Sequence, residues 1–309
     1  MKSSAFVLLG ACVLFVAGDA SAQDSEPDNA IVVTAQLSGA PMWTIKTERG
    51  TIILVGELFA VPKSTPWQPD RLEWATERAQ RVILGTRPKI SLGDIFRVIF
   101  KGGKLTRLPK GKVAADYLDP AQRRRFEALE AEYKQDYSRK SFLITSFDLL
   151  TKRLGFNRHT GDDASDVVRR AARRAGVPAE PVGTVRGKDM LDSLFEAPPE
   201  SHLPCLDASM SAAEQGPELV EQRGLDWRAF DVRAVMANPL EMALGRCWPW
   251  ADPDVGNVLR GQWVEAIDRA AGAEGITLGV APLQVLAEKE GILDQLKLKG
   301  FEIHGPAWR

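Results

Sequence analysis

The sequence predicts an α+β fold of the mixed α/β type, with a central sheet system built from N- and C-terminal strands and flanked by helices. Two observations predict this fold. Strand-like apolar segments occur within residues 41–85 and 276–303, and the segment between them, from about 91 to 244, is mostly helical in pattern. The chain of 309 residues is 44% hydrophobic and 26% charged, so it can bury a sizeable core.

The first residues have the pattern of a secretory signal peptide. Lys2 precedes an apolar run from Ala5 to Gly18, and the small residues Ala20-Ser21-Ala22 follow. The run is shorter than the roughly 20 residues that a helix needs to cross a bilayer. We therefore expect cleavage after Ala22, a periplasmic or secreted protein, and a polar leader over 23–40. An uncleaved anchor is the alternative, and we expect no transmembrane segment after cleavage.

Residues 41–56 predict a hairpin. Apolar and polar residues alternate, the chain turns at Arg49-Gly50, and the pattern then becomes continuously apolar. The second strand is therefore expected to be buried on both faces. A helix over 70–80 and a short buried strand over 81–85 complete a β-β-α-β unit.

Helix start signals mark the middle segment. Ser91, Asp119, and either Asp162 or Asp163 precede helical runs, and Gly176 ends the third run. The remaining expected elements are a strand over 181–185, a helix over 188–195, a helical pair over 203–237, a helix over 258–271, a strand over 276–280, helices over 284–290 and 292–299, and a strand over 301–303.

Two cysteines remain after removal of the signal peptide, Cys205 and Cys247. An even pair exported to an oxidising compartment predicts a disulfide. Two separate buried thiols are the alternative. Neither a Cys-x-x-Cys motif nor a neighbouring histidine indicates redox catalysis or zinc binding.

The charge balance disfavours a nucleic-acid-binding protein. Forty Lys and Arg residues stand against forty-one Asp and Glu residues, which gives a formal net charge of −1. The run Arg123-Arg124-Arg125 could form an anion-binding patch, but acidic residues follow it directly, so we interpret it as a solvated helix face.

Several short motifs occur near the two ends of the chain, and their order and spacing can be compared with those of known families. The motifs are Pro41-Met42-Trp43, Thr51-Ile52-Ile53-Leu54-Val55-Gly56, Val61-Pro62, Arg81-Val82-Ile83-Leu84, Arg260, Trp263, Ile276-Thr277-Leu278-Gly279-Val280-Ala281 and Gly291-Ile292-Leu293 with Leu296 and Gly300-Phe301. In these motifs the chain resembles the TraB/GumN family, which is grouped with the Tiki-type metalloproteases. The resemblance implies one domain over 41–309 with a helical insert at about 91–244.

The resemblance also implies where a metallohydrolase centre would lie. Family members carry Gly-x-x-His after a buried strand at each end, and a glutamate after the strand that follows the first helix. The two histidine positions are Phe59 and Pro282 in this chain, and the glutamate position is Gly85. None of these three residues has a side-chain lone pair for a metal, so we expect no metal and no cofactor at this site.

A residual pocket remains a hypothesis at the same place, formed by Gly56, Glu57, Arg87, Arg260 and Gly279. Glu57 could bind a cation or accept a proton, although an ion pair with Arg87 or Arg260 is the interpretation we prefer. Nearby aromatic residues could make the pocket suitable for a peptide or a small apolar ligand, or they could belong to the core. These residues are Trp43, Trp67, Trp74, Trp248 and Trp250.

The sequence therefore favours an exported protein that has lost metallohydrolase activity and acts as a binding or accessory protein. The first alternative is a metal-dependent peptidase or hydrolase with a rearranged site that uses Glu57. The second is a binder of haem or another small ligand. Whether the chain is an enzyme stays open at this point.

Overall fold

A computed structural model of the chain describes residues 39–309. The predicted signal peptide, its cleavage point after Ala22 and nearly all of the predicted leader lie outside the described residues. Within the described part, no helix combines the length and the apolar character that crossing a membrane requires.

The centre of the fold is a mixed sheet of six strands in the order β5-β3-β7-β2-β1-β8. The strands are β1 (Met42–Lys46), β2 (Gly50–Glu57), β3 (Arg81–Leu84), β5 (Ala179–Pro181), β7 (Gly275–Pro282) and β8 (Ile303–His304). β5, β3, β7 and β2 are parallel, whereas β1 pairs antiparallel with both β2 and β8. The predicted mixed α/β fold with strands from both ends is confirmed.

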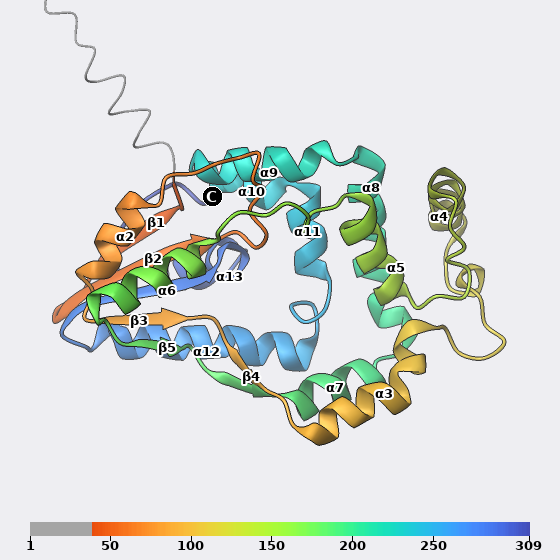
Figure 1. Ribbon diagram of the computed structural model, residues 1–309, viewed down its shortest axis with the longest axis horizontal. Helices are drawn as coiled ribbons and strands as arrows, with labels where there is room; N and C mark the ends of the chain where they lie inside the picture. Colours follow the sequence, from red (N-terminus) through yellow and green to blue (C-terminus); the bar gives the residue numbers. More distant parts are fainter. Residues whose placement is uncertain (1–38) are drawn as a thin grey trace, which may run out of the picture.

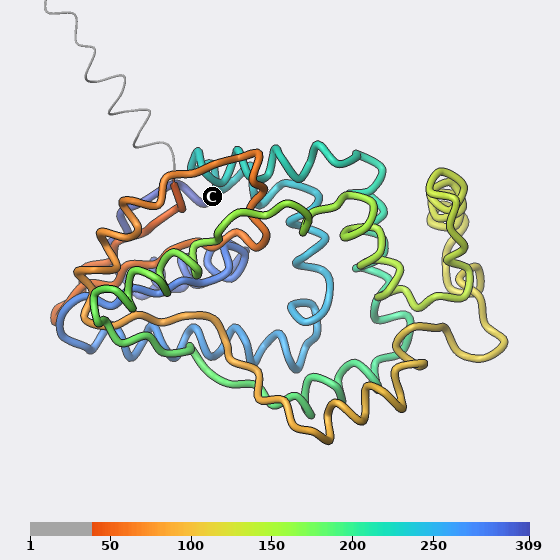
Figure 2. The backbone as a smooth tube through the Cα atoms, viewed as in Figure 1, coloured from red at the N-terminus to blue at the C-terminus, as the bar shows by residue number. Residues whose placement is uncertain are grey.

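The C-terminal strand β7 lies between the two N-terminal strands β2 and β3. Its register places Pro282 beside Glu57 of β2 and Gly279 beside Ile83 of β3. The continuous burial of Thr277–Ala281 in β7, and the absence of any fully exposed residue in β2, agree with strands covered on both faces. Because the three strands are parallel, their carboxyl ends meet at one edge of the sheet. Figure 2 shows the orange segment of β2 and the blue segment of β7 running side by side towards this edge.

Helices from both halves of the sequence cover the sheet (Figure 1). They are α2 (Asp70–Glu77), α6 (Ala164–Ala175), α12 (Pro253–Ala271), α13 (Leu283–Ala287) and α14 (Ile292–Leu298). The start of α6 is fixed by Asp163, whose side chain accepts the backbone N–H of Asp166, and its end by Gly176 with φ of 70°. The predicted end at Gly176 is confirmed, and of the two candidates for the start, Asp162 and Asp163, the structure has Asp163.

The other helices form an arc that begins with α9 and α10 close to the sheet and runs around the molecule to α7 and α3, as Figure 1 shows. They are α3 (Leu92–Thr106), α4 (Pro120–Tyr133), α5 (Phe142–Asp148), α7 (Gly187–Glu196), α8 (Leu203–Gln215), α9 (Glu218–Arg228), α10 (Val232–Ala237) and α11 (Pro239–Arg246), with short turns of 3-10 helix at Ala114–Asp116 and Pro199–His202 and of π-helix at Leu149–Arg153. The helical pair predicted over 203–237 is three helices, because the chain turns again before α10.

The single strand predicted over 181–185 is wrong. The chain forms β5 in the main sheet and then β6 (Thr184–Arg186), which pairs with β4 (Arg87–Lys89) in a separate two-stranded sheet. Gly183 lies at the break, where a Cβ atom would come within 2.3 Å of the Gln262 side chain. This close approach favours glycine at the point where the chain leaves the main sheet.

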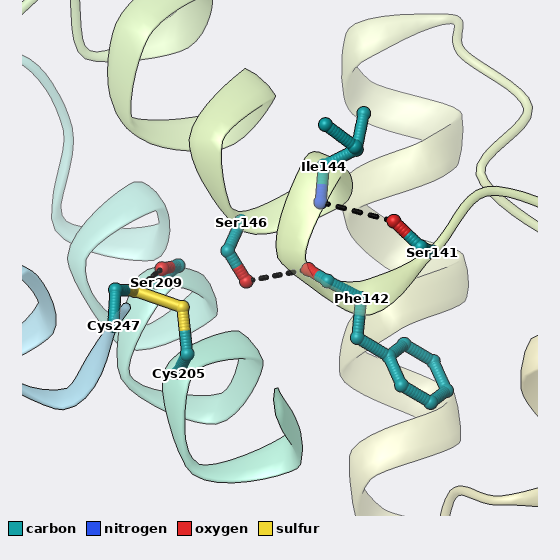
Figure 3. Close-up of a disulfide and its surroundings, with 7 residues drawn as sticks. All are labelled: Ser141, Phe142, Ile144, Ser146, Cys205, Ser209 and Cys247. Carbon is teal, nitrogen blue, oxygen red and sulfur yellow. Dashed lines mark hydrogen bonds between the residues drawn. A yellow bond between two sulfur atoms is a disulfide. The ribbon is translucent and has the colours of Figure 1, made fainter. Parts of the chain in front are cut away.

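The structure contains the predicted disulfide between Cys205 and Cys247 (Figure 3). It joins the first turn of α8 to the residue that follows α11, and both cysteines are buried together with Leu143 of α5. The bridge therefore links α8 to the end of α11, and α5 packs against it.

Candidate functional site

The three positions that the sequence associates with a metal centre lie at one edge of the sheet. Phe59 follows β2, Gly85 directly follows β3, and Pro282 is the last residue of β7. These strands are neighbours in the order β3-β7-β2. The carboxyl edge of a parallel sheet is where sites of α/β proteins usually lie, so we take this edge as the candidate functional site.

The space at these positions differs. No atom lies within 4 Å of the point where a Cβ atom of residue 85 would stand, so the edge is open there. The Phe59 side chain is 62% exposed, and its ring lies 6.0 Å from that of Phe156. Pro282 is half-buried. The Phe59 ring is thus largely accessible, and an open space adjoins Gly85.

Glu57 is the acidic residue of β2 at this edge. Its Oε1 accepts the backbone N–H of Ser165, in the first turn of α6, at 2.9 Å. Burial, together with the charge of Asp163, raises the pKa of Glu57 from 4.5 to about 7, although the bond from Ser165 opposes the rise. Burial likewise raises the pKa of Asp163. The edge therefore holds two interacting carboxyl groups at the N-terminus of a helix.

The expected ion pair of Glu57 with Arg87 or Arg260 is wrong. Arg260 binds Glu288 instead, with its Nε 2.6 Å from one carboxylate oxygen and its Nη2 3.0 Å from the other. Arg87 is exposed in β4. An N–H of α6 holds the Glu57 carboxyl group because α6 packs against β2, a contact that strand and helix patterns do not reveal.

The other residues of the hypothetical residual pocket lie in strands. Gly56 precedes Glu57 in β2, and a Cβ atom there would come within 2.5 Å of Leu283 and 3.1 Å of Trp43. Gly279 lies inside β7 opposite Leu54. The structure therefore brings Gly56, Glu57 and the end of β7 together, and it leaves Arg87 and Arg260 outside this group.

Helix α9 holds the end of β2, and the sequence did not indicate this role. Trp227 donates its Nε1–H to the Gly56 carbonyl at 2.8 Å, and Arg223 donates from Nη1 to the Phe59 carbonyl at 3.0 Å. Arg223 also pairs with Glu241 of α11, with 2.6 Å between Nη2 and Oε2 and side chains only 1% and 8% exposed. Arg223 and Trp227 are four residues apart, so their side chains lie on the same face of α9. This spacing is the one sequence signal that could have suggested a shared contact.

The tryptophans proposed as pocket material have different surroundings. Trp43 is fully buried in the core and donates its Nε1–H to the Pro306 carbonyl. Trp67 packs edge-on against Trp227. Trp74 is 56% exposed and lines a cavity of about 650 Å³ between β1, α2 and β8. Trp74 therefore borders a hollow away from the carboxyl edge, whereas Trp43 belongs to the core.

The donor atoms at the carboxyl edge do not fit a catalytic metal centre. The acidic side chains there, Glu57 and Asp163, each accept a backbone N–H of α6, from Ser165 and Asp166 respectively. Within residues 39–309, no three His, Cys, Asp or Glu side chains lie close enough together to hold a metal ion. A divalent metal in a hydrolase normally needs at least three protein ligands.

The raised pKa of Glu57 predicts a stability change with pH. The folded protein holds this proton to higher pH than the unfolded chain, so the stabilisation is complete below about pH 4.5 and is lost as the pH rises towards about 7. Glu57→Gln cannot ionise. We therefore compare the free energy of unfolding of the variant with that of the unsubstituted protein. As the pH rises from acidic values to 8, this difference should shift in favour of the variant by up to about 3 kcal/mol, measured by urea unfolding.

Glu48→Gln is the matched control for this prediction, because Glu48 is exposed in the hairpin turn. It should leave the pH profile of stability unchanged. Identical profiles for Glu57→Gln and the unsubstituted protein would contradict the raised pKa of Glu57.

Comparisons with known proteins agree with the motifs at the two chain ends. The model of the TraB/PrgY/gumN family matches residues 41–304, from β1 to β8. A search of curated proteins and a search of solved structures found no match.

Proposed function

The chain belongs to the TraB/PrgY/gumN family, and we propose that it is an exported binding or accessory protein without metal-dependent hydrolase activity. The observation that carries the proposal is the set of residues at the carboxyl edge of the sheet. Phe59, Gly85 and Pro282 occupy the positions that the resemblance assigns to metal ligands, and they lie at the ends of adjacent strands.

The location of these residues makes a shifted alignment a poor explanation for the missing ligands. Glu57 and Pro282 are direct partners in the β2–β7 register, and β3 adjoins β7. The substituted positions therefore belong to one site in space. A site that has lost all three of these donors lacks the ligand set with which the family centre would hold a metal and activate a metal-bound water.

An active hydrolase with a rearranged site is the second candidate. The pKa of Glu57, about 7, lies in the range that suits a general acid or base at neutral pH. Asp163 next to it could share the proton. This candidate requires that Glu57 reach a substrate, whereas its carboxyl group now accepts an N–H from α6.

We expect the purified protein to retain much less than one metal ion per chain after equilibration with zinc, manganese or cobalt and dialysis. We also expect no Glu57-dependent hydrolysis when the protein is incubated with a peptide library, because no set of three metal ligands lies among the described residues. Metal analysis and peptide mass spectrometry measure the two outcomes. Stoichiometric metal, with turnover that Glu57→Gln abolishes, would establish the hydrolase instead.

A positive control restores the family ligands by combining Phe59→His, Gly85→Glu and Pro282→His. The open space at Gly85 leaves room for a glutamate side chain. Metal retained by this variant would show that the assay detects a centre at this edge. A haem titration followed by absorbance tests the other ligand class, and an unchanged Soret band counts against a haem binder.

A further inference from the structure

Helix α3, together with Ile90 just before it, exposes an unusual amount of apolar surface. Seven large apolar residues between positions 90 and 100 have exposed fractions of 45% to 78%. They are Ile90, Leu92, Ile95, Phe96, Val98, Ile99 and Phe100. The described chain has only five other large apolar residues with comparable exposure, and those are scattered. A contiguous exposed apolar surface usually marks an interaction site.

The helix is oriented with its polar side towards the protein. Asp94 is buried, and its carboxylate accepts the backbone N–H of the capping residue Ser91. Arg97 forms an ion pair with Asp192 of α7. Leu92, Phe96 and Ile99 follow one another at helical spacing on the opposite side. Figure 1 shows α3 beside α7 at the periphery of the molecule. The apolar stripe thus faces away from the rest of the fold.

Positive charge surrounds this stripe. Residues 87–112 contain eight Lys and Arg residues and a single acid, Asp94, although the whole chain has a net charge of −1. Five of these cations follow the stripe towards and beyond the end of α3, and all five are exposed: Lys101, Lys104, Arg107, Lys110 and Lys112. This local charge is opposite in sign to the rest of the chain taken together.

A basic cavity lies at the C-terminal end of the stripe. It has a volume of about 440 Å³ and is lined in part by Lys104, Arg107 and Lys110, with Phe142 and Leu194 also in its wall. Lysine and arginine side chains bind phosphate oxygens. The cavity is therefore suited to an anionic headgroup at the end of an apolar surface.

We propose that α3 and the basic segment after it, to Lys112, form a docking surface for a lipid bilayer that carries anionic headgroups. The apolar stripe enters the boundary between headgroups and acyl chains, and the cations contact the phosphates. A helix with a large apolar face and flanking Lys and Arg residues lies in the membrane interface in this way, and each cation near an anionic surface adds attraction.

Charge favours a bilayer over a second copy of the chain. In a symmetric dimer through α3, the cations of each copy would face a segment whose single acid, Asp94, is buried, so the second copy would offer them no negative charge. An anionic bilayer supplies opposite charge along the whole segment. The proposal is independent of any activity at the carboxyl edge, because α3 packs on α7 and α5 rather than on the central sheet.

Vesicle sedimentation tests this proposal with the protein lacking residues 1–22. We expect binding to vesicles of phosphatidylcholine mixed with phosphatidylglycerol at least about tenfold tighter than to pure phosphatidylcholine, and weaker binding in high salt. Phe96→Ser combined with Phe100→Ser should reduce binding to the mixed vesicles at least about tenfold. Lys101→Glu combined with Lys104→Glu should abolish the preference for anionic lipid.

Leu298→Ser is the matched control, since Leu298 is 85% exposed on α14, outside the stripe. It should leave binding unchanged, and unfolding curves should show that each variant is folded. The proposal is overturned if the unsubstituted protein does not bind the mixed vesicles, or if Leu298→Ser reduces binding as much as the two phenylalanine substitutions. It is also overturned if those substitutions dissociate a dimer in sedimentation velocity without changing lipid binding.

Discussion

Arg223→Ala is expected to lower the free energy of unfolding by about 3 to 5 kcal/mol. The guanidinium group is fully buried between α9, α11 and the chain after β2, where it pairs with Glu241 and donates to the Phe59 carbonyl. Removing it leaves a buried carboxylate without its partner and a backbone carbonyl without this donor. Urea unfolding followed by circular dichroism measures the loss.

Two further variants separate the ion pair from general effects. Arg233→Ala removes an exposed arginine of α10 and should change stability by less than about 0.5 kcal/mol. Arg223→Met combined with Glu241→Leu removes both charges and should recover most of the loss, because the cost comes mainly from the unpaired charge. A loss below about 1 kcal/mol for Arg223→Ala would show that Glu241 finds another partner or water.

The central sheet could be predicted because its strands are coded locally. Continuous apolar runs such as Ile52–Val55 and Leu278–Ala281 identify buried strands without knowledge of their partners. The position of β7 between β2 and β3 could not be derived from such patterns, because the pairing joins residues more than 190 positions apart. The family motifs, with their order at the two ends, supplied the expectation that these strands meet.

The surroundings of the candidate site were harder to predict than its positions. The N–H that the Glu57 carboxyl group accepts belongs to Ser165, 108 residues away. Of the two arginines expected to pair with Glu57, Arg260 binds Glu288 and Arg87 is exposed. Arg223 lies in a helix rich in charged residues, and its sequence neighbourhood resembles that of a surface arginine. Burial of a charged side chain depends on tertiary packing, which a single sequence does not encode in a readable pattern.

The orientation of helix α3 could not be predicted from the sequence either, because its apolar side is exposed instead of buried. Its capping residue and its apolar spacing could be recognised, and an apolar stripe normally faces the core. Here the buried Asp94 and the pair between Arg97 and Asp192 determine which side faces α7. The orientation of an amphipathic helix therefore needs the structure, whereas its existence does not.

Cys205→Ala combined with Cys247→Ala is expected to lower the free energy of unfolding by about 4 kcal/mol in the chain-entropy model. The bridge closes a loop over a sequence separation of 42, which contains most of α8 and all of α9, α10 and α11. It therefore limits the unfolded chain across the helices that hold the end of β2. Urea unfolding of the oxidised protein and of the double variant measures the difference.

The same bridge connects stability to the compartment in which the chain folds. Disulfides form in oxidising compartments, whereas cysteine thiols stay reduced in the cytosol. Protein produced in the cytosol should therefore match the double variant in stability until it is oxidised. Adding a reductant should lower the stability of the oxidised protein and leave the double variant unchanged. Two titratable thiols in denatured, unreduced protein from an oxidising compartment would contradict the bridge, and a loss below about 1 kcal/mol would contradict its stabilising role.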